Sequence, residues 1–152
     1  MNRVVEKALE KLVADKIRAS FGTHANLLSI APLAGDASTR RYFRASLSGP
    51  AVPPSVVVME LGGGSLPLSS EELAIFNEPL KELPFLNLHR FLSRIGVRIP
   101  ALYGHWVEDG LLFLEDLGDL SLWEVVQACP PGEILGWYEK AIDQLLLIQV
   151  RG

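Results

Sequence analysis

Apolar residues recur every three or four positions from Val4 to Phe21, and Gly22 follows them. This spacing is typical of an amphipathic helix, and glycine commonly ends one. The pattern predicts a helix over residues 3–21 with one apolar stripe. Such a stripe requires a partner surface in the rest of the fold.

Five later segments have the alternation or the β-branched runs of strands. The third of them, "SVVVMEL", has the composition of a buried strand. The last two flank Asp109-Gly110, a dipeptide typical of hairpin turns. The predicted strands lie near residues 27–34, 41–47, 55–61, 101–107 and 111–115.

Further helices are predicted between the third and fourth strands and after the last strand. Pro84 at a first helical position and Gly96 just beyond the last apolar residue bound a helix that contains residues 85–95. Ser121 and Glu124 have the spacing of a capping box for a short helix. A longer helix begins near Gly132.

A second capping box is predicted at Ser69 and Glu72, where Pro79 allows only a short helix. The order of elements is then helix, three strands, helix, two strands and helices. This order predicts the α+β class, with a five-stranded, mainly antiparallel sheet, an N-terminal helix, a helix between the third and fourth strands, and C-terminal helices.

The composition and charge of the chain argue against several classes of protein. The chain has 152 residues, 49% of them hydrophobic, which is enough for one ordinary core. The net charge of −4 argues against nucleic acid as a partner. No apolar run is long enough to span a membrane, the charged N-terminal segment does not resemble a signal peptide, and the single Cys129 cannot form an internal disulfide. We therefore expect a cytoplasmic protein without a membrane partner.

The stretch "LAGDASTRRYFRAS", residues 33–46, carries more chemistry than a hairpin requires. Its glycine, hydroxyl groups and main-chain N–H groups are followed at once by Arg40 and Arg41. These groups together suit a phosphate. A turn with two solvated arginines is the alternative that the loop taken alone leaves open.

Four stretches in this order resemble the aminoglycoside/choline phosphotransferase-like family, and most of all its bacterial branch that phosphorylates amino sugars such as N-acetylmuramate. They are "LAGDASTRRYFR", "VVVMEL", "PFLNLHRFLSRIGVRIPALYG" and "LLFLEDLGDLSL". The resemblance runs from about Lys7 to Ile148. It implies a protein-kinase-like N-lobe at residues 1–117, followed at 118–152 by the hinge and the first helices of a C-lobe.

The resemblance also implies a nucleotide site. The phosphates would be bound by Gly35, Asp36, Ala37, Ser38, Thr39, Arg40 and Arg41. The adenine pocket and hinge would comprise Phe43, Val58, Glu115, Asp116 and Leu117, with main-chain groups of Glu115 and Leu117 pairing with the base. ATP is the expected cofactor, with GTP left open, and Mg²⁺ is expected only together with the C-lobe, because this chain has no predicted metal ligand.

The first departure from kinase chemistry concerns the lysine that usually binds the phosphates. Met59 occupies its position, and the helix of residues 85–95 lacks the glutamate that pairs with this lysine. We predict that Arg41 takes over neutralisation of the phosphates. The alternative is that Arg41 only pairs with a carboxylate such as Glu60.

The catalytic residues form the second departure. None of His24, His89 and His105 begins the H-x-D-x-x-x-x-N loop that phosphoryl transfer requires in this family. We therefore expect one lobe of a larger kinase, inactive alone, whose small-molecule acceptor (a sugar or an amino sugar) binds to the full-length protein.

Two other functions remain open. A non-catalytic interaction or regulatory module could keep the N-lobe fold without nucleotide. A mononucleotide-binding α/β domain is disfavoured, because "VVVMELGGGSLPLSSEEL" matches neither glycine-rich phosphate motif.

The last helix is apolar on more than one side, which is typical of helices inside larger proteins. We expect an exposed apolar surface and self-association through residues 134–150. Trp106, Trp123 and Trp137 fall on different elements, and we expect them to pack rather than to form a sugar platform.

Overall fold

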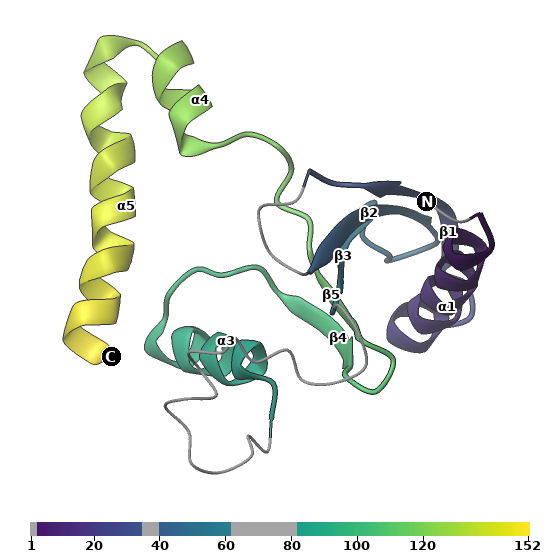
Figure 1. The fold of residues 1–152 in the computed structure, drawn as a ribbon. Coiled ribbons are helices and arrows are strands. Elements are labelled where there is room, and N and C mark those ends of the chain that lie inside the picture. Colours follow the sequence, from purple (N-terminus) through teal and green to yellow (C-terminus); the bar gives the residue numbers. More distant parts are fainter. Residues whose placement is uncertain (1–2, 35–39, 62–81) are drawn as a thin grey trace. The chain divides into compact units, whose positions relative to one another are not determined.

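The computed structural model describes residues 3–34, 40–61 and 82–152 (Figure 1). The helices are α1 (Arg3–Phe21), α3 (Pro84–Ile95), α4 (Leu122–Ala128) and α5 (Pro131–Arg151). The strands are β1 (Asn26–Pro32), β2 (Arg41–Ser48), β3 (Ser55–Glu60), β4 (Leu102–Trp106) and β5 (Leu111–Glu115). These elements confirm the predicted α+β class and element order. The predicted short helix after Ser69 lies outside the described residues.

The chain divides into two units. The first comprises Met1–Leu73 and Ala101–Asp116 and holds α1 and the five strands. The second comprises Ala74–Pro100 and Leu117–Gly152 and holds α3, α4 and α5. This grouping is not the same as the predicted lobes at 1–117 and 118–152, whose boundary stays a prediction.

The sheet has the strand order β1-β2-β3-β5-β4, and every neighbouring pair is antiparallel. The predicted hairpin at Asp109-Gly110 joins β4 to β5. Its turn is closed by the N–H of Asp109, which donates to the carbonyl of Trp106 at 3.1 Å. Gly110 adopts a φ of 68°, a left-handed conformation that favours glycine.

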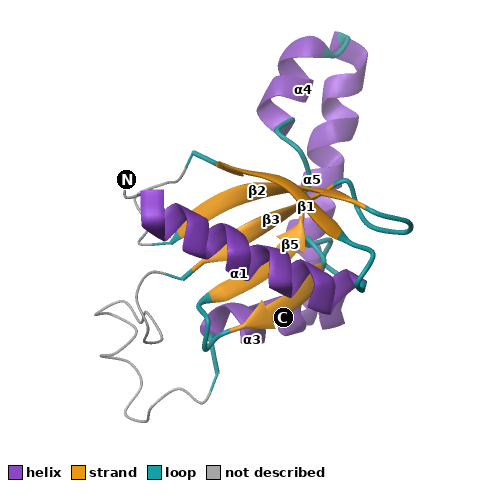
Figure 2. Ribbon diagram, turned by 90° about the vertical axis from the view of Figure 1, so that its right-hand side faces the viewer, coloured by secondary structure: helices purple, strands orange, loops and turns teal. Residues whose placement is uncertain are grey.

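The core of the first unit lies between α1 and one face of the sheet (Figure 2). Val13 and Ile17 of α1 are fully buried there, as the helical spacing requires. The strands contribute Phe43, Ala45, Leu47, Val56, Val58, Leu111 and Phe113. Because each large side chain removed from water contributes roughly 1.5–3 kcal/mol, this layer provides most of the apolar stabilisation of the unit.

The second unit is built from helices whose ends agree with the sequence. α3 begins at Pro84 and is capped by Gly96, whose φ is 87°. α4 has the predicted capping box between Ser121 and Glu124. A polar contact connects α5 with the loop after α3: Gln144 accepts from the main-chain N–H of Arg98 at 2.9 Å.

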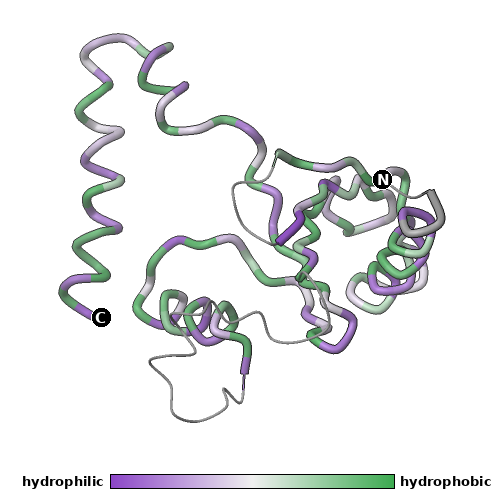
Figure 3. Tube along the Cα trace, viewed as in Figure 1, coloured by the Kyte–Doolittle hydropathy of each residue, from purple (hydrophilic) through white to green (hydrophobic). Residues whose placement is uncertain are grey.

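α5 is described along its full length, and none of its residues is buried. Apolar residues recur along it (Figure 3), and several of them are exposed. The exposed ones are Leu135, Tyr138, Ile142, Leu145, Leu146, Ile148 and Val150. The predicted exposed apolar surface is therefore present. Across the described ranges, no helix combines the length and the apolar character needed to cross a bilayer.

Candidate functional site

Of the predicted phosphate-binding residues, Gly35, Asp36, Ala37, Ser38 and Thr39 lie outside the described part of the chain. Arg41 begins β2 and has Glu60 of β3 as its cross-strand partner. Nη2 of Arg41 donates to Oε1 of Glu60 at 2.7 Å, and Nε lies 2.5 Å from Oε2. The pairing with Glu60 is thus confirmed, and the contact of Arg41 with phosphate stays a prediction.

Strand alternation separates the predicted residues between two faces of the sheet. Arg41, Phe43 and Glu60 point to the α1 face, whereas Tyr42 and Met59 share the opposite face. Arg41 therefore does not stand beside the position of the usual lysine. Met59 itself is fully buried, where an unpaired lysine would carry a large desolvation cost.

Phe43 and Val58, predicted in the adenine pocket, are buried in the core against α1. Phe43 also borders a hollow of about 410 Å³ between α1 and β1, which is lined in addition by Glu6, Glu10 and Leu28 among others. A contact of Phe43 or Val58 with a base stays a prediction.

The predicted hinge is held to the edge strand by Glu115. Its N–H donates to the carbonyl of Ala101 at 2.8 Å, and its side-chain Oε2 accepts from the N–H of Ala101 at 3.0 Å. The N–H of Ala101 thus donates to the side chain of Glu115 and not to its main-chain carbonyl. Leu117, which was also predicted in the hinge, is the first residue of the 117–152 part of the second unit and is exposed.

A polar network adjoins the hinge on the face opposite α1, and sequence reasoning missed it. Arg44 of β2 donates to Asp116 twice, from Nε to Oδ2 at 2.7 Å and from Nη2 to Oδ1 at 3.0 Å. Ser55 of β3 adds a third bond, from its hydroxyl to Oδ2 at 2.7 Å. The side chains of Arg44 and Asp116 are 26% and 6% exposed.

The bidentate arrangement gives strong charge-assisted hydrogen bonds with a defined geometry. Alternation along β2 places Arg44 opposite the face of Arg41, so the direction of Arg44 was available from sequence. Its partner was not, because Asp116 lies 72 residues away and the register of three strands brings the two together.

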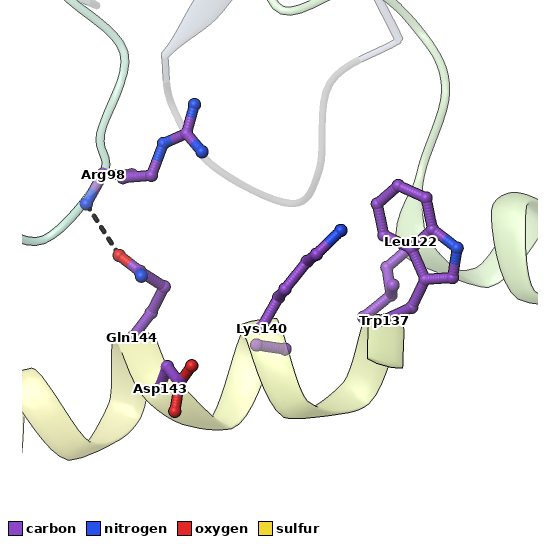
Figure 4. A pocket seen from close by; sticks show the side chains of 7 residues that line it. Arg98, Leu122, Trp137, Lys140, Asp143 and Gln144 are labelled. Atoms are coloured by element: carbon purple, nitrogen blue, oxygen red, sulfur yellow. Dashed lines mark hydrogen bonds between the residues drawn. The ribbon is translucent and has the colours of Figure 1, made fainter. Parts of the chain in front are cut away.

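The second unit has a hollow of its own, of about 340 Å³, lined by Arg98, Leu122, Trp137, Lys140 and Gln144 among others (Figure 4). Nζ of Lys140 lies 4.3 Å from the ring centre of Trp137. Among the residues that the structure describes, none of those predicted for nucleotide binding lines this hollow.

The three tryptophans differ in their surroundings. Trp106 packs against the core, with its ring centre 4.9 Å from that of Phe113, as predicted. Trp123 is 70% exposed, so the expectation that it packs was wrong. The reason is that α4 is short and that Val126 is its buried residue.

The described part of the chain has no group of three or more His, Cys, Asp or Glu residues that could hold a metal ion.

The fold defines an α+β domain with a five-stranded antiparallel sheet and a helix between β3 and β4. No family model matches the chain. Over 118 residues, 78% of its length, the chain is 30% identical to N-acetylmuramate/N-acetylglucosamine kinase from Pseudomonas aeruginosa. That match covers 29% of the kinase, so the chain spans less than a third of this curated relative. The similarity is partial and supports a kinase-related domain.

Proposed function

We propose that this chain is the ATP-binding lobe of a small-molecule kinase, which transfers the γ-phosphate to a hydroxyl group of a sugar or amino sugar. The partial identity with an amino-sugar kinase is the observation that carries the proposal. The sheet supports it, because its five antiparallel strands and the position of α3 between β3 and β4 match the expectation from the resemblance. Fold alone would not specify a function.

The phosphates are assigned to residues 35–41. Glycine, hydroxyl and main-chain N–H groups in this segment can donate to phosphate oxygens, and Arg40 and Arg41 supply positive charge. For Arg41 the assignment is supported by its place as the first residue of β2, next to the segment, and by its side chain, which stays 44% exposed although it pairs with Glu60.

The base is assigned to the main chain of Glu115 and Leu117. The carbonyl of Glu115 is a suitable acceptor for an amino group, since the side chain of the same residue binds the N–H of Ala101. Phe43 and Val58 then support the sheet beneath the site from the core.

Catalysis is assigned to the rest of the kinase. The sequence contains no H-x-D-x-x-x-x-N motif for the catalytic base and the magnesium ligand. We therefore expect that this chain binds nucleotide and does not transfer phosphate by itself. The acceptor and Mg²⁺ would be bound together with the catalytic residues.

Replacement of Arg41 by alanine tests the phosphate assignment. We expect Arg41→Ala to weaken binding of Mg-ATP by roughly tenfold, because a charge-assisted contact to phosphate is lost. Isothermal titration calorimetry measures this change. Arg18→Ala is the matched control, since Arg18 has an exposed carboxylate partner, Asp15, on α1. Equal affinity of Arg41→Ala and the parent chain would remove Arg41 from the site.

A second function is favoured by the exposed apolar residues of α5. Leu135, Tyr138, Ile142 and Leu145 follow one another at spacings of three and four and share one helix face. An exposed face of this kind marks an interaction surface. A non-catalytic interaction module that self-associates through residues 134–150 is therefore the alternative.

A further inference from the structure

The network of Arg44, Ser55 and Asp116 joins three strands at the point where the chain leaves the sheet. Arg44 lies in β2, Ser55 begins β3, and Asp116 directly follows β5. The register places Val56 opposite Glu115, so Ser55 and Asp116 are the next pair along the same ladder. The carboxylate of Asp116 thus continues the contact of β3 with β5 by one residue, through a side chain.

The side chain and the main chain of Asp116 differ in their exposure to solvent. Its side chain is 6% exposed, whereas the residue as a whole is partly exposed. The main chain is therefore the more accessible part. The hydrogen bonds that the carboxylate accepts from Arg44 and Ser55 fix this main chain.

Glu115 is fixed from the other side of the strand. Its N–H and its side chain both bind Ala101, which precedes β4. Two consecutive side chains, those of Glu115 and Asp116, thus hold the same short main-chain segment, one toward β4 and the other toward β2 and β3. A recognition group made of main-chain atoms requires this kind of support, because affinity is lost when a binding segment must first be ordered.

We propose that Arg44 is a positioning residue for the nucleotide base: through Asp116 and with Ser55 it holds the end of β5 so that the carbonyl of Glu115 accepts a hydrogen bond from the 6-amino group of adenine. The inference rests on the proposed nucleotide-binding function and adds to it a selectivity. Hypoxanthine has a carbonyl oxygen in place of the amino group, and two acceptors facing each other repel. The site therefore prefers ATP to ITP.

Three ligands separate this role from a general effect on folding. ATP and ITP differ at the base, and inorganic tripolyphosphate has no base. We expect the 152-residue chain, in the presence of Mg²⁺, to bind ATP roughly tenfold more tightly than ITP. ATP makes a hydrogen bond with the carbonyl of Glu115, whereas ITP leaves this acceptor unsatisfied. Arg44→Lys keeps the charge and removes the bidentate geometry. We expect it to reduce the ATP-to-ITP preference to about twofold or less and to leave the affinity for tripolyphosphate unchanged.

Two further variants complete the experiment. Ser55→Ala removes the bond from the Ser55 hydroxyl to Asp116 and serves as a second variant if Arg44→Lys does not fold; we expect an intermediate ATP-to-ITP preference. Arg18→Lys makes the same substitution in the exposed pair with Asp15 on α1, and we expect it to bind all three ligands like the parent chain. Thermal unfolding of each variant reports whether the fold is retained.

The outcomes distinguish the inference from the proposed function. An ATP-to-ITP preference that is unchanged in the folded variants would overturn the positioning role while nucleotide binding stands. An equal loss of affinity for all three ligands would also overturn it, because that result would mean that Arg44 affects the stability of the fold and not the recognition of the base. If the parent chain binds neither ATP nor ITP, the proposed function fails, and the positioning role fails with it.

Discussion

Two guanidinium–carboxylate pairs lie on opposite faces of the sheet and differ in their exposure. The Arg41 and Glu60 side chains are 44% and 20% exposed, and those of Arg44 and Asp116 are 26% and 6% exposed. Solvent screens the first pair and leaves it with a small effect on stability. The second pair is more strongly coupled to the fold, because loss of either partner leaves a charge with little access to water.

This difference predicts the effect of removing each carboxylate. We expect Asp116→Ala to lower the free energy of unfolding by about 2–3 kcal/mol, since Arg44 loses both of its bonds to the carboxylate and Ser55 loses its acceptor. Glu60→Ala is the comparison and should cost about 1 kcal/mol or less. Urea unfolding measures both values. Equal losses for the two variants would contradict the assigned difference in burial.

The capping box of α4 predicts a pH dependence at the residue scale. The main-chain N–H of Ser121 and, after it, the Ser121 hydroxyl hold the pKa of Glu124 below its ordinary value of 4.5. A carboxyl whose pKa is lowered by folding stabilises the fold fully above its unfolded pKa. That contribution is lost as the pH falls through the lowered folded pKa.

Replacement of the serine tests the cause of this shift. Ser121→Ala keeps the main-chain bond to Glu124 and removes the hydroxyl, so we expect the pKa of Glu124 to rise part of the way toward 4.5. An NMR titration of the Glu124 side chain measures the change. A pKa of Glu124 at or above 4.5 in the parent chain would contradict the capping account.

At the scale of elements, helix α1 is the partner that completes the sheet. Ile17 is fully buried against the strands, whereas Leu28 of β1 is mostly exposed. We expect Ile17→Ala to destabilise the chain by about 2–5 kcal/mol and Leu28→Ala by about 0.5 kcal/mol or less. Thermal and urea unfolding provide the comparison. Similar losses at the two positions would mean that α1 does not cover the core as described.

The bounds of most elements follow from local patterns, which explains why the sequence predicted them. The predicted helix at 3–21 matches α1, and Pro84 and Gly96 mark the ends of α3. The first strand was predicted to reach residue 34 and ends at Pro32, although the N–H of Leu33 still donates to Tyr42 at 2.9 Å. Turn and cap residues act within a few positions, so they are readable without the fold.

The site was less predictable, because its contacts depend on register. Alternation along β2 places Arg41 and Arg44 on opposite faces, and Glu60 was named as a partner of Arg41. The partner of Arg44 required the pairing of β3 with β5, which no local pattern of the sequence specifies. The same holds for the exposure of Trp123, which depends on what packs against α4.

At the scale of the whole molecule, α5 leaves an apolar face exposed. Ile142 lies on it together with Leu135 and Tyr138. We expect the chain to form oligomers at high concentration and Ile142→Glu to shift it toward monomer, because a charge cannot be buried in an apolar contact without a partner. Sedimentation velocity measures the distribution. Gln127→Glu adds the same charge at an exposed position of α4 and serves as the control. A parent chain that stays monomeric would contradict self-association through 134–150.

The central claim is that this chain binds ATP as part of a kinase. A calorimetric titration of the 152-residue chain with ATP in the presence of Mg²⁺ tests it most directly, with Mg²⁺ alone as the blank. We predict saturable binding of one nucleotide per chain without release of phosphate. The absence of binding up to about 1 mM ATP, an upper limit for a functional site of this kind, would contradict the claim and leave the interaction module as the function to pursue.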